Sequence, residues 1–141
     1  MLPLRYARHW RVTSAVLMAF VLAATLMPAI WLWPDRAQAV LWFEKLDKLA
    51  HLVTFALLAL WFAGQYRPRS YWRIAGGLIA FGVLIEICQR AVGYRSAELS
   101  DVVADVAGII IGLAIATAGA GGWCQTFEDW YIGRRSGDGS E

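Results

Sequence analysis

The stretch VVADVAGIIIGLAIATAGAG, residues 102–121, carries a single charged side chain, Asp105. A transmembrane helix needs about 20 predominantly apolar residues, because the hydrocarbon core of a bilayer is about 30 Å thick and a helix rises about 1.5 Å per residue. Three further stretches of this kind lie near residues 14–33, 47–65 and 74–92. We therefore predict an all-α integral membrane protein, a four-helix bundle with short loops.

The overall composition also indicates a membrane as the solvent. Of the 141 residues, 59% are hydrophobic and 17% are charged, a balance too apolar for an ordinary soluble domain of this size. The four stretches leave loops of about a dozen residues or fewer, with no room for a separate soluble domain. We expect a single transmembrane domain over residues 1–132. The formal net charge of +2 is small, and we expect no nucleic acid partner.

The distribution of Lys and Arg predicts the orientation, since cytoplasmic segments of membrane proteins carry the excess of these residues. Four crossings place eight of them on one face and five on the other. The larger group is Arg5, Arg8, Arg11, Arg67, Arg69, Arg73, Arg134 and Arg135, and the smaller is Arg36, Lys45, Lys48, Arg90 and Arg95. We therefore predict a multi-pass protein of the cytoplasmic (inner) membrane with both termini in the cytoplasm.

The N-terminal region has an alternative interpretation as a cleaved secretory signal, because a basic start and an apolar run precede the small-residue segment AQA at 37–39. The apolar run spans about 20 residues, which is longer than the usual core of a signal. Trp31, Trp33 and Pro34 also interrupt the approach to the cleavage site. We expect the first helix to be retained.

A segment rich in aromatic residues follows the fourth apolar stretch. Aromatic side chains recur at helical spacing through WCQTFEDWY, residues 123–131, so we expect a helix over 123–132 that lies in the inner membrane interface. A ragged end of the fourth helix is the alternative. Residues 133–141 are polar and glycine-rich and are predicted to be disordered. Cys88 and Cys124 fall near opposite membrane faces, so we expect no disulfide between them.

Ionisable side chains within the apolar stretches form three groups, the first at the start of the second stretch. A charged group in hydrocarbon costs about 2.5–3.5 kcal/mol on insertion scales, so such groups are rare unless they are paired, hydrated or functional. Asp47 and His51 are helical i, i+4 neighbours, and Lys48 stands three residues before His51. All three side chains are therefore expected to reach one site.

The second group lies in the third stretch, where Glu86, Gln89 and Arg90 share one helical stripe. Glu86 falls four to six residues inside the outer end, roughly 6–9 Å deep, and is the deepest acid of the chain. A structural ion-pair lock is one interpretation of this group. A carboxylate of a functional site is the other.

The third group repeats at helical spacing along the fourth stretch. Asp101, Asp105, Gly108 and Gly112 share one helix face. Two glycines four residues apart allow a neighbouring helix backbone to approach closely, which orients this face, with its two acids, toward the interior of the bundle.

The three groups fall at the same membrane level, while the inner halves of the helices are almost purely apolar. This pattern predicts one polar pocket open to the outer face. A helix start in the head-group region is the simpler interpretation of the first group taken alone. A solute pathway is not expected, because the inner halves offer no polar route. The residues expected to line the pocket are Asp47, Lys48, His51, Glu86, Gln89, Arg90, Arg95, Asp101 and Asp105.

These residues carry a resemblance to the VanZ-like family, small membrane proteins named after an accessory factor of resistance to the glycopeptide antibiotic teicoplanin. The matching motifs are DKxxH from Asp47, ExxQ from Glu86, GxR from Gly93 and DxxxDxxGxxxG from Asp101. They cover all but the first helix and the tail. The family usually has Asn where this chain has Asp105. The resemblance implies a four-helix protein of the bacterial envelope and leaves its activity open.

Two functions fit the predicted pocket. The first is a binding module whose site takes an anionic envelope lipid, a cell-wall precursor or a partner protein, with Lys48, Arg90 and Arg95 holding a phosphate or carboxylate. The second is an enzyme that modifies such a lipid by acid–base chemistry, with Glu86 or Asp105 as base and His51 as proton shuttle. One His among carboxylates is a weak indication of metal binding, so we expect no metal and no cofactor.

Overall fold

The computed structural model describes residues 1–26, 36–92 and 98–137, and for residues 36–45 and 135–137 it describes the backbone alone. This part of the chain is helical and contains no strand. The elements are α1 (Ala7–Thr25), α2 (Arg36–Gln65), the short 3-10 helix η2 (Pro68–Ser70), α3 (Tyr71–Val92), α4 (Leu99–Ile115), the π-helical turn η3 (Ala116–Ala120) and α5 (Trp123–Gly137).

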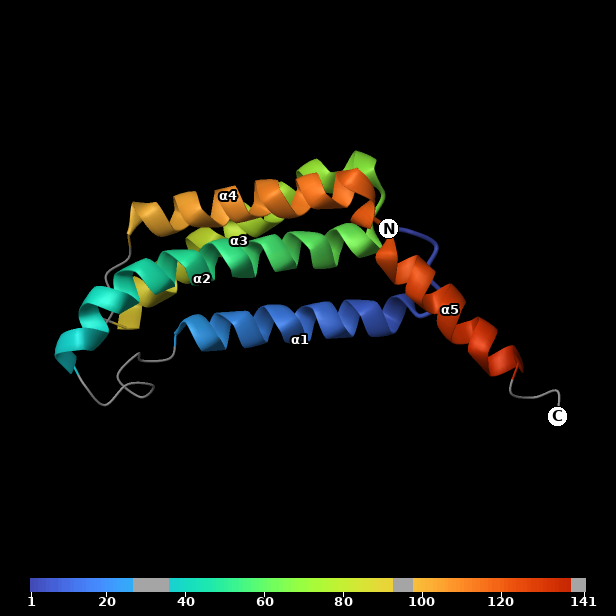
Figure 1. Ribbon diagram of the computed structural model, residues 1–141, viewed down its shortest axis with the longest axis horizontal. Coiled ribbons are helices and arrows are strands. Elements are labelled where there is room, and N and C mark those ends of the chain that lie inside the picture. Colours follow the sequence, from blue (N-terminus) through green and yellow to red (C-terminus); the bar gives the residue numbers. More distant parts are fainter. Residues whose placement is uncertain (27–35, 93–97, 138–141) are drawn as a thin grey trace.

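The first four helices lie side by side along the long axis of the molecule (Figure 1). The chain reverses direction between α2 and α3 and again before α4, so α2 and α4 run parallel while α3 runs antiparallel to both. The N-terminus and the start of α5 lie at the end of the bundle where α2 is joined to α3 (Figure 1). That end is called the terminal end below, and the opposite end, where α4 begins, is called the site end.

Three of these helical segments are long and apolar enough to cross a membrane: Leu46–Gln65, Pro68–Val92 and Leu99–Ala120. They confirm the stretches predicted near 47–65, 74–92 and 102–121. The stretch predicted at 14–33 is helical up to Thr25 within α1, while 27–33 lie outside the described residues, so its crossing stays a prediction.

The helix bounds differ from the predicted ones at two places. The second helix begins at Arg36 rather than near 47, because RAQAVLWFEKL, residues 36–46, contains no Gly or Pro and is rich in residues of high helix propensity. The last helix continues to Gly137, five residues beyond the end predicted at 132, and 138–141 lie outside the described residues. In its last turns the guanidinium of Arg134 lies 4.3 Å from the ring centroid of Trp130, a cation–π contact that favours helix.

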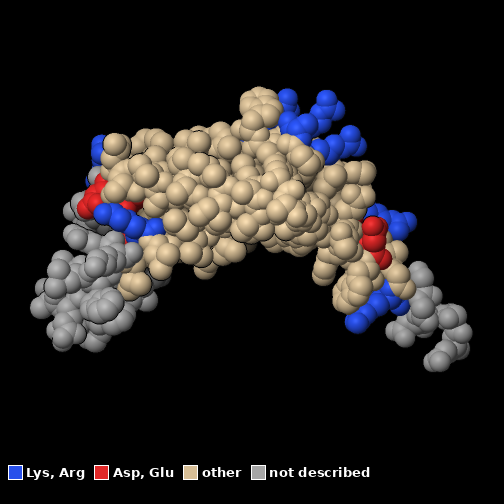
Figure 2. All heavy atoms as spheres, turned by 45° about the horizontal axis from the view of Figure 1, so that its top comes forward, with Lys and Arg blue, Asp and Glu red and all other residues tan. Residues whose placement is uncertain are grey.

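Charged side chains gather at the two ends of the bundle. Figure 2 shows Lys and Arg at both ends and an uncharged band across the middle of the visible face. Acidic side chains appear at the site end and on the outlying α5 (Figure 2). An apolar band between charged ends is the surface that a bilayer requires.

The register of the bundle is set where α4 meets α2. A Cβ atom on Gly108 would collide with the backbone carbonyl oxygen of Leu52, and one on Gly112 would collide with that of Ala56. The two glycines therefore let the parallel helix backbones touch, as expected for a small-xxx-small pair. This contact fixes which residues of α2 lie beside which residues of α4.

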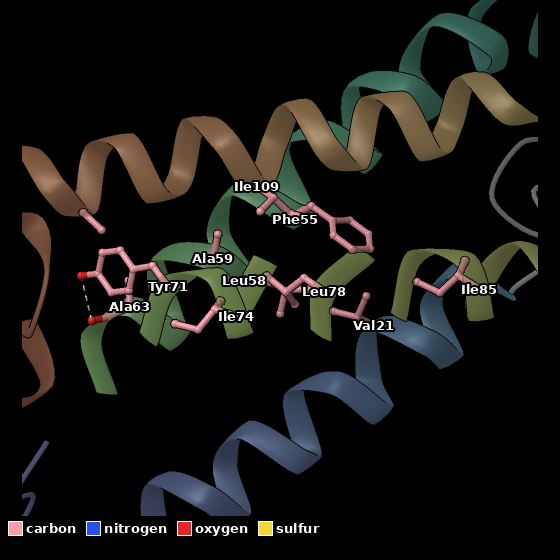
Figure 3. Close-up of a cluster of buried hydrophobic side chains, with 11 residues drawn as sticks. Val21, Phe55, Leu58, Ala59, Ala63, Tyr71, Ile74, Leu78, Ile85 and Ile109 are labelled. Carbon is pink, nitrogen blue, oxygen red and sulfur yellow. Dashed lines mark hydrogen bonds between the residues drawn. The ribbon is translucent and has the colours of Figure 1, made fainter. Parts of the chain in front are cut away.

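The core is built by apolar side chains from all four bundle helices. Figure 3 shows Val21 of α1, Phe55 and Leu58 of α2, Leu78 of α3 and Ile109 of α4 pointing toward one another. Lipid tails are as apolar as these side chains, so close packing rather than exclusion of water holds such a core together.

Glycines redirect the chain after α4. Gly119 (φ 131°) and Gly122 (φ 74°) adopt backbone conformations that other residues rarely take, and α5 leaves the bundle axis there (Figure 1). The amide of Gly122 donates to the carbonyl of Ala63 at 3.1 Å, which ties this turn to the end of α2. Burial raises the pKa of the adjacent Cys124 thiol to about 12, so this thiol stays protonated.

Glu128 of α5 holds the N-terminal segment in place. Its carboxylate accepts hydrogen bonds from the backbone N–H of Arg5 at 2.7 Å and of Tyr6 at 3.0 Å, and from the indole N–H of Trp10 at 2.7 Å. Burial alone would raise the pKa of Glu128, but these hydrogen bonds outweigh it, and the pKa lies below its usual value. Glu128 is thus the clasp between the two ends of the chain.

Candidate functional site

A buried ion pair joins α2 to α4 near the site end. Nδ1 of His51 lies 2.8 Å from Oδ1 of Asp105, and the two side chains are only 4% and 1% exposed. A carboxylate accepts hydrogen bonds, so Nδ1 is the ring nitrogen that carries a proton. The other ring nitrogen, Nε2, is left to act as acceptor, base or metal ligand.

The glycine contact explains why these two residues meet. Gly108 lies beside Leu52 and Gly112 beside Ala56, an offset of 56 residue numbers between α4 and α2. His51 and Asp105 differ by 54, close to this offset, so they lie at nearly the same level along the two helices. Asp47 and Asp101 are also 54 apart, and each precedes a member of the pair by one helical turn. Because the helices run parallel, Asp47 and Asp101 therefore also come level with each other.

Three of these side chains form a compact group. One ring nitrogen of His51 and one carboxylate oxygen each from Asp47 and Asp101 all lie within 4.8 Å of one another. His51 and Asp101 are buried, and Asp47 is half-buried. The sequence had placed these residues among those expected to line one pocket, and the packing of α2 against α4 sets how close they come.

Glu86 joins the same level from α3. Both of its carboxylate oxygens are buried, and neither has a hydrogen-bond partner among the described residues. It interacts electrostatically with Asp101, His51 and Asp105, and also with the nearby backbone N–H of Glu98. The antiparallel register agrees, because a Cβ atom on Gly82 would collide with Oδ2 of Asp105, and Glu86 lies one turn further along α3, toward the level of Asp101.

Only one of the two carboxylate oxygens of Asp105 has a hydrogen-bond partner among the described residues. Its Oδ1 pairs with His51, while its Oδ2 is buried and without a hydrogen-bond partner among the described residues. The space in which Oδ2 lies exists because residue 82 of α3 is glycine. The described site therefore contains three buried carboxylate oxygens with unmet acceptor capacity, two of Glu86 and one of Asp105.

A more exposed ion pair borders the buried group. Nζ of Lys48 lies 3.4 Å from Oε2 of Glu98, with side chains 45% and 41% exposed. The hydroxyl of Ser100 also donates to Oε2 of Glu98 at 2.9 Å. The hydrogen bond from Ser100, followed by the interaction with Lys48, lowers the pKa of Glu98. Glu98 thus stays ionised beside Lys48 near neutral pH.

Aromatic rings separate the polar group from the interior of the bundle. The ring of Phe55 lies nearly parallel to the imidazole of His51, at 6.5 Å between centroids, one helical turn further along α2. Phe81 of α3 packs on Phe55 at 6.2 Å. Phe55 and Phe81 therefore border the His51–Asp105 pair on the side that faces the interior of the bundle.

The remaining predicted site residues have different environments. Gln89 is buried, but its amide donates to the backbone carbonyl of Thr25 at 3.1 Å, so it joins α3 to α1. Arg90 is exposed at the end of α3. Arg95 lies outside the described residues. Asp47, Lys48, His51, Glu86, Asp101 and Asp105 are thus the predicted residues that the structure brings to one region.

A separate hollow of about 390 Å³ lies at the terminal end, between the start of α1 and α5. Its walls include Tyr6, Trp10 and Phe127, together with Glu128. The carboxylate of Glu128 already accepts three hydrogen bonds, so it offers no unmet polar group. The site end, where buried acceptors remain unpaired, is the better candidate for chemistry.

Comparison with known proteins identifies the family of the chain. A family model described as VanZ/LLP1 matches residues 4–120 and so covers all four bundle helices and the site. No curated protein and no solved structure gave a significant match.

Proposed function

This chain belongs to the VanZ/LLP1 family of membrane proteins, and we propose that it binds the polar head group of an anionic envelope lipid or lipid-linked cell-wall precursor at the site end. The observation that carries the proposal is the set of buried, unpaired carboxylate oxygens of Glu86 and Asp105. Leaving a buried acceptor unpaired costs about 1–3 kcal/mol, and more when the group is charged. A ligand with hydroxyl or amine donors would remove that cost.

Lys48 is the described cation best placed for the anionic part of such a ligand. Its side chain is partly exposed beside the buried acids and is held by Glu98 at 3.4 Å. Exposed ion pairs of this kind contribute about 0–1 kcal/mol, so exchanging Glu98 for a phosphate group costs little. Arg90 and Arg95 are the further cations proposed to contact the ligand.

The proposed location is the outer face of the inner membrane, with both termini in the cytoplasm. Arg67, Arg69 and Arg73 lie at or next to the α2–α3 connection, at the same end as the N-terminus and the start of α5. The positive-inside rule assigns that end to the cytoplasm. The site end then faces the periplasm, where a cell-wall precursor is used. The segment α5 is proposed to lie in the inner interface.

The His51–Asp105 pair supports catalysis as a second candidate function. A carboxylate on Nδ1 fixes the imidazole ring and increases the basicity of Nε2, which suits a general base or proton shuttle. Glu86 would act as the second acid–base group. The reaction class is modification of the head group of the bound lipid. A lipid-binding site is required for either function.

Native mass spectrometry of the detergent-solubilised protein tests the binding proposal. The probes are phosphatidylglycerol, cardiolipin and undecaprenyl phosphate, with phosphatidylcholine as the net-neutral comparison. We expect an anionic lipid to be retained preferentially and Lys48→Gln or Glu86→Gln to weaken its retention about tenfold or more, since a lost hydrogen bond to a charged group costs about 1.5–3 kcal/mol.

The matched control is Asp129→Asn, which removes an exposed charge from α5 at the other end of the molecule. Equal retention of all four lipids by wild type and by every variant would contradict the proposal. In that case capture of a partner protein becomes the better explanation. Conversion of a retained lipid by wild type, lost in His51→Gln, would assign the catalytic function.

A further inference from the structure

The geometry points to a binding site for a divalent transition-metal ion formed by Asp47, His51 and Asp101. Their three candidate ligand atoms lie within 4.8 Å of one another. Nitrogen and oxygen ligands bind Zn²⁺ at about 2.0–2.2 Å, so two ligands of one ion lie at most about 4.4 Å apart. Modest rotation of these side chains is enough to close the group around an ion.

The imidazole of His51 is held in the form that a metal ion requires. Asp105 accepts the Nδ1–H hydrogen bond at 2.8 Å, which leaves the lone pair of Nε2 for coordination. Metal-binding histidines commonly donate their other N–H to a carboxylate in this way, because that partner fixes the tautomer and strengthens the ligand. Asp105 is thus a positioning residue, and Phe55 restricts the ring from one side.

The charge of the site independently favours a cation. Asp101, Asp105 and Glu86 are buried around His51, with Asp47 half-buried beside them. Among the described cations, Lys48 pairs with Glu98 at 3.4 Å and also interacts electrostatically with Asp101, and Arg90 is exposed. Close carboxylates that repel one another are stabilised strongly by a divalent ion, above all where water is scarce.

The unpaired acceptors are a second observation that points to a ligand. Glu86 is outside the three-residue group, yet its buried carboxylate interacts with His51 and Asp101 and lacks a partner among the described residues. Three protein ligands leave coordination positions open to water, as in catalytic metal sites. A water bound to the ion would supply a hydrogen-bond donor to the carboxylate of Glu86.

The ligand set indicates which ions fit. One imidazole with two carboxylates matches Zn²⁺, Mn²⁺ or Fe²⁺ and provides no thiolate for a soft ion. Such an ion would also offer its open positions to the phosphate of a head group. That last step rests on the proposed function, whereas metal binding itself does not require lipid.

Calorimetric titration of Zn²⁺ into the detergent-solubilised full chain, stripped with chelator and without added lipid, tests the site. We expect about one ion per chain, with Mn²⁺ competing for the same site. His51→Gln and Asp101→Asn should each weaken binding by at least tenfold, and Asp105→Asn by about tenfold to hundredfold, the usual effect of changing a partner of a metal ligand.

His9→Gln is the matched control, because it removes the other histidine of the chain from an exposed position at the terminal end. It should leave Zn²⁺ affinity unchanged. Thermal unfolding of each variant without metal shows which variants are folded. If one of the site variants is not folded, Asp47→Asn takes its place in the titration.

Two results would overturn the inference: no saturable binding to wild type, or equal losses in His9→Gln and His51→Gln. Saturable Zn²⁺ binding without selective retention of an anionic lipid would leave the metal site standing and the lipid proposal rejected. Selective lipid retention that is unchanged by chelator, together with no Zn²⁺ binding, would support the lipid proposal and reject the metal site.

Discussion

Gly108 of α4 lies directly against the backbone carbonyl of Leu52 in α2, the residue that follows His51. This contact leaves no space for a side chain at position 108. It sets the helices at the spacing and register at which His51 reaches Asp105 at 2.8 Å. Gly108, which has no side chain, thus determines the geometry of the polar site.

The first prediction follows from that contact. Gly108→Ala should lower the Tm, because the added methyl must displace the backbone of α2, and strain of this kind typically costs about 1–3 kcal/mol. It should also weaken lipid and metal binding, since His51 and Asp105 move apart. Gly76→Ala is the control: nothing lies within 4 Å of a Cβ there, so a helical alanine should be neutral or should stabilise by up to about 1 kcal/mol. Equal effects of the two changes would show that the close approach is unimportant.

The second prediction separates a functional carboxylate from a structural ion pair. Glu86 has no hydrogen-bond partner among the described residues, so Glu86→Gln should keep or raise membrane abundance and Tm while weakening ligand binding. A structural lock would show the opposite, a loss of about 3–5 kcal/mol from leaving its cation unpaired. Recovery of a destabilised Glu86→Gln by Arg90→Gln or Arg95→Gln would establish the lock instead.

The third prediction concerns the charge at position 105. In Asp105→Asn the amide oxygen can still accept the Nδ1–H of His51, so we expect the fold to survive with a loss in Tm that corresponds to less than about 2 kcal/mol. Asp105→Leu keeps the volume but leaves a buried imidazole unpaired and should cost about 1–3 kcal/mol more. Thermal unfolding in detergent compares the two. A leucine variant as stable as the asparagine variant would mean that the His51–Asp105 hydrogen bond does not hold α2 to α4.

The fourth prediction is a pH dependence that originates at the terminal end. The pKa of Glu128 is lower in the folded protein than in the unfolded chain, so its contribution to stability is fully present above the unfolded value of about 4.3 and is lost as pH falls through the folded value. Glu128→Gln should therefore cost about 2 kcal/mol or more at pH 7 and progressively less below about pH 4.

Tm measured from pH 7 downward for wild type and Glu128→Gln checks this, with Asp129→Asn as the exposed neighbour that should change little. A constant difference between wild type and Glu128→Gln down to the lowest pH would show that the Glu128 carboxylate is not the source. Release of the N-terminal segment should accompany the loss, because the Arg5 and Tyr6 amides and the Trp10 indole are the donors.

The fifth prediction is the topology. Both termini should report a cytoplasmic position in reporter fusions, because the Arg-rich connection between α2 and α3 lies at their end of the bundle. A C-terminal alkaline phosphatase fusion active in the periplasm would reverse the orientation and place the candidate site on the cytoplasmic side. Fluorescent-protein fusions, which fluoresce in the cytoplasm, supply the complementary measurement.

Much of the candidate site was predictable because helical spacing is local. The pairs Asp47 with His51 and Asp101 with Asp105 follow from i, i+4 geometry, and Glu86 was expected inside the bundle, where it lies. Gln89 shared a stripe with Glu86 in the sequence, yet its amide donates to Thr25 of α1. Spacing shows which residues share a face and does not show which neighbouring helix that face meets.

By itself, the sequence determined the helical class and the three long apolar helices, because each depends on composition or on neighbours within two turns of one helix. The tertiary structure decided what depends on the packing of different helices: the His51–Asp105 pair, the grouping of Asp47, His51 and Asp101, and the Glu128 clasp. These contacts join residues 50 to 123 positions apart, and their partners are selected by backbone contacts such as that of Gly108 with Leu52, which no local pattern encodes.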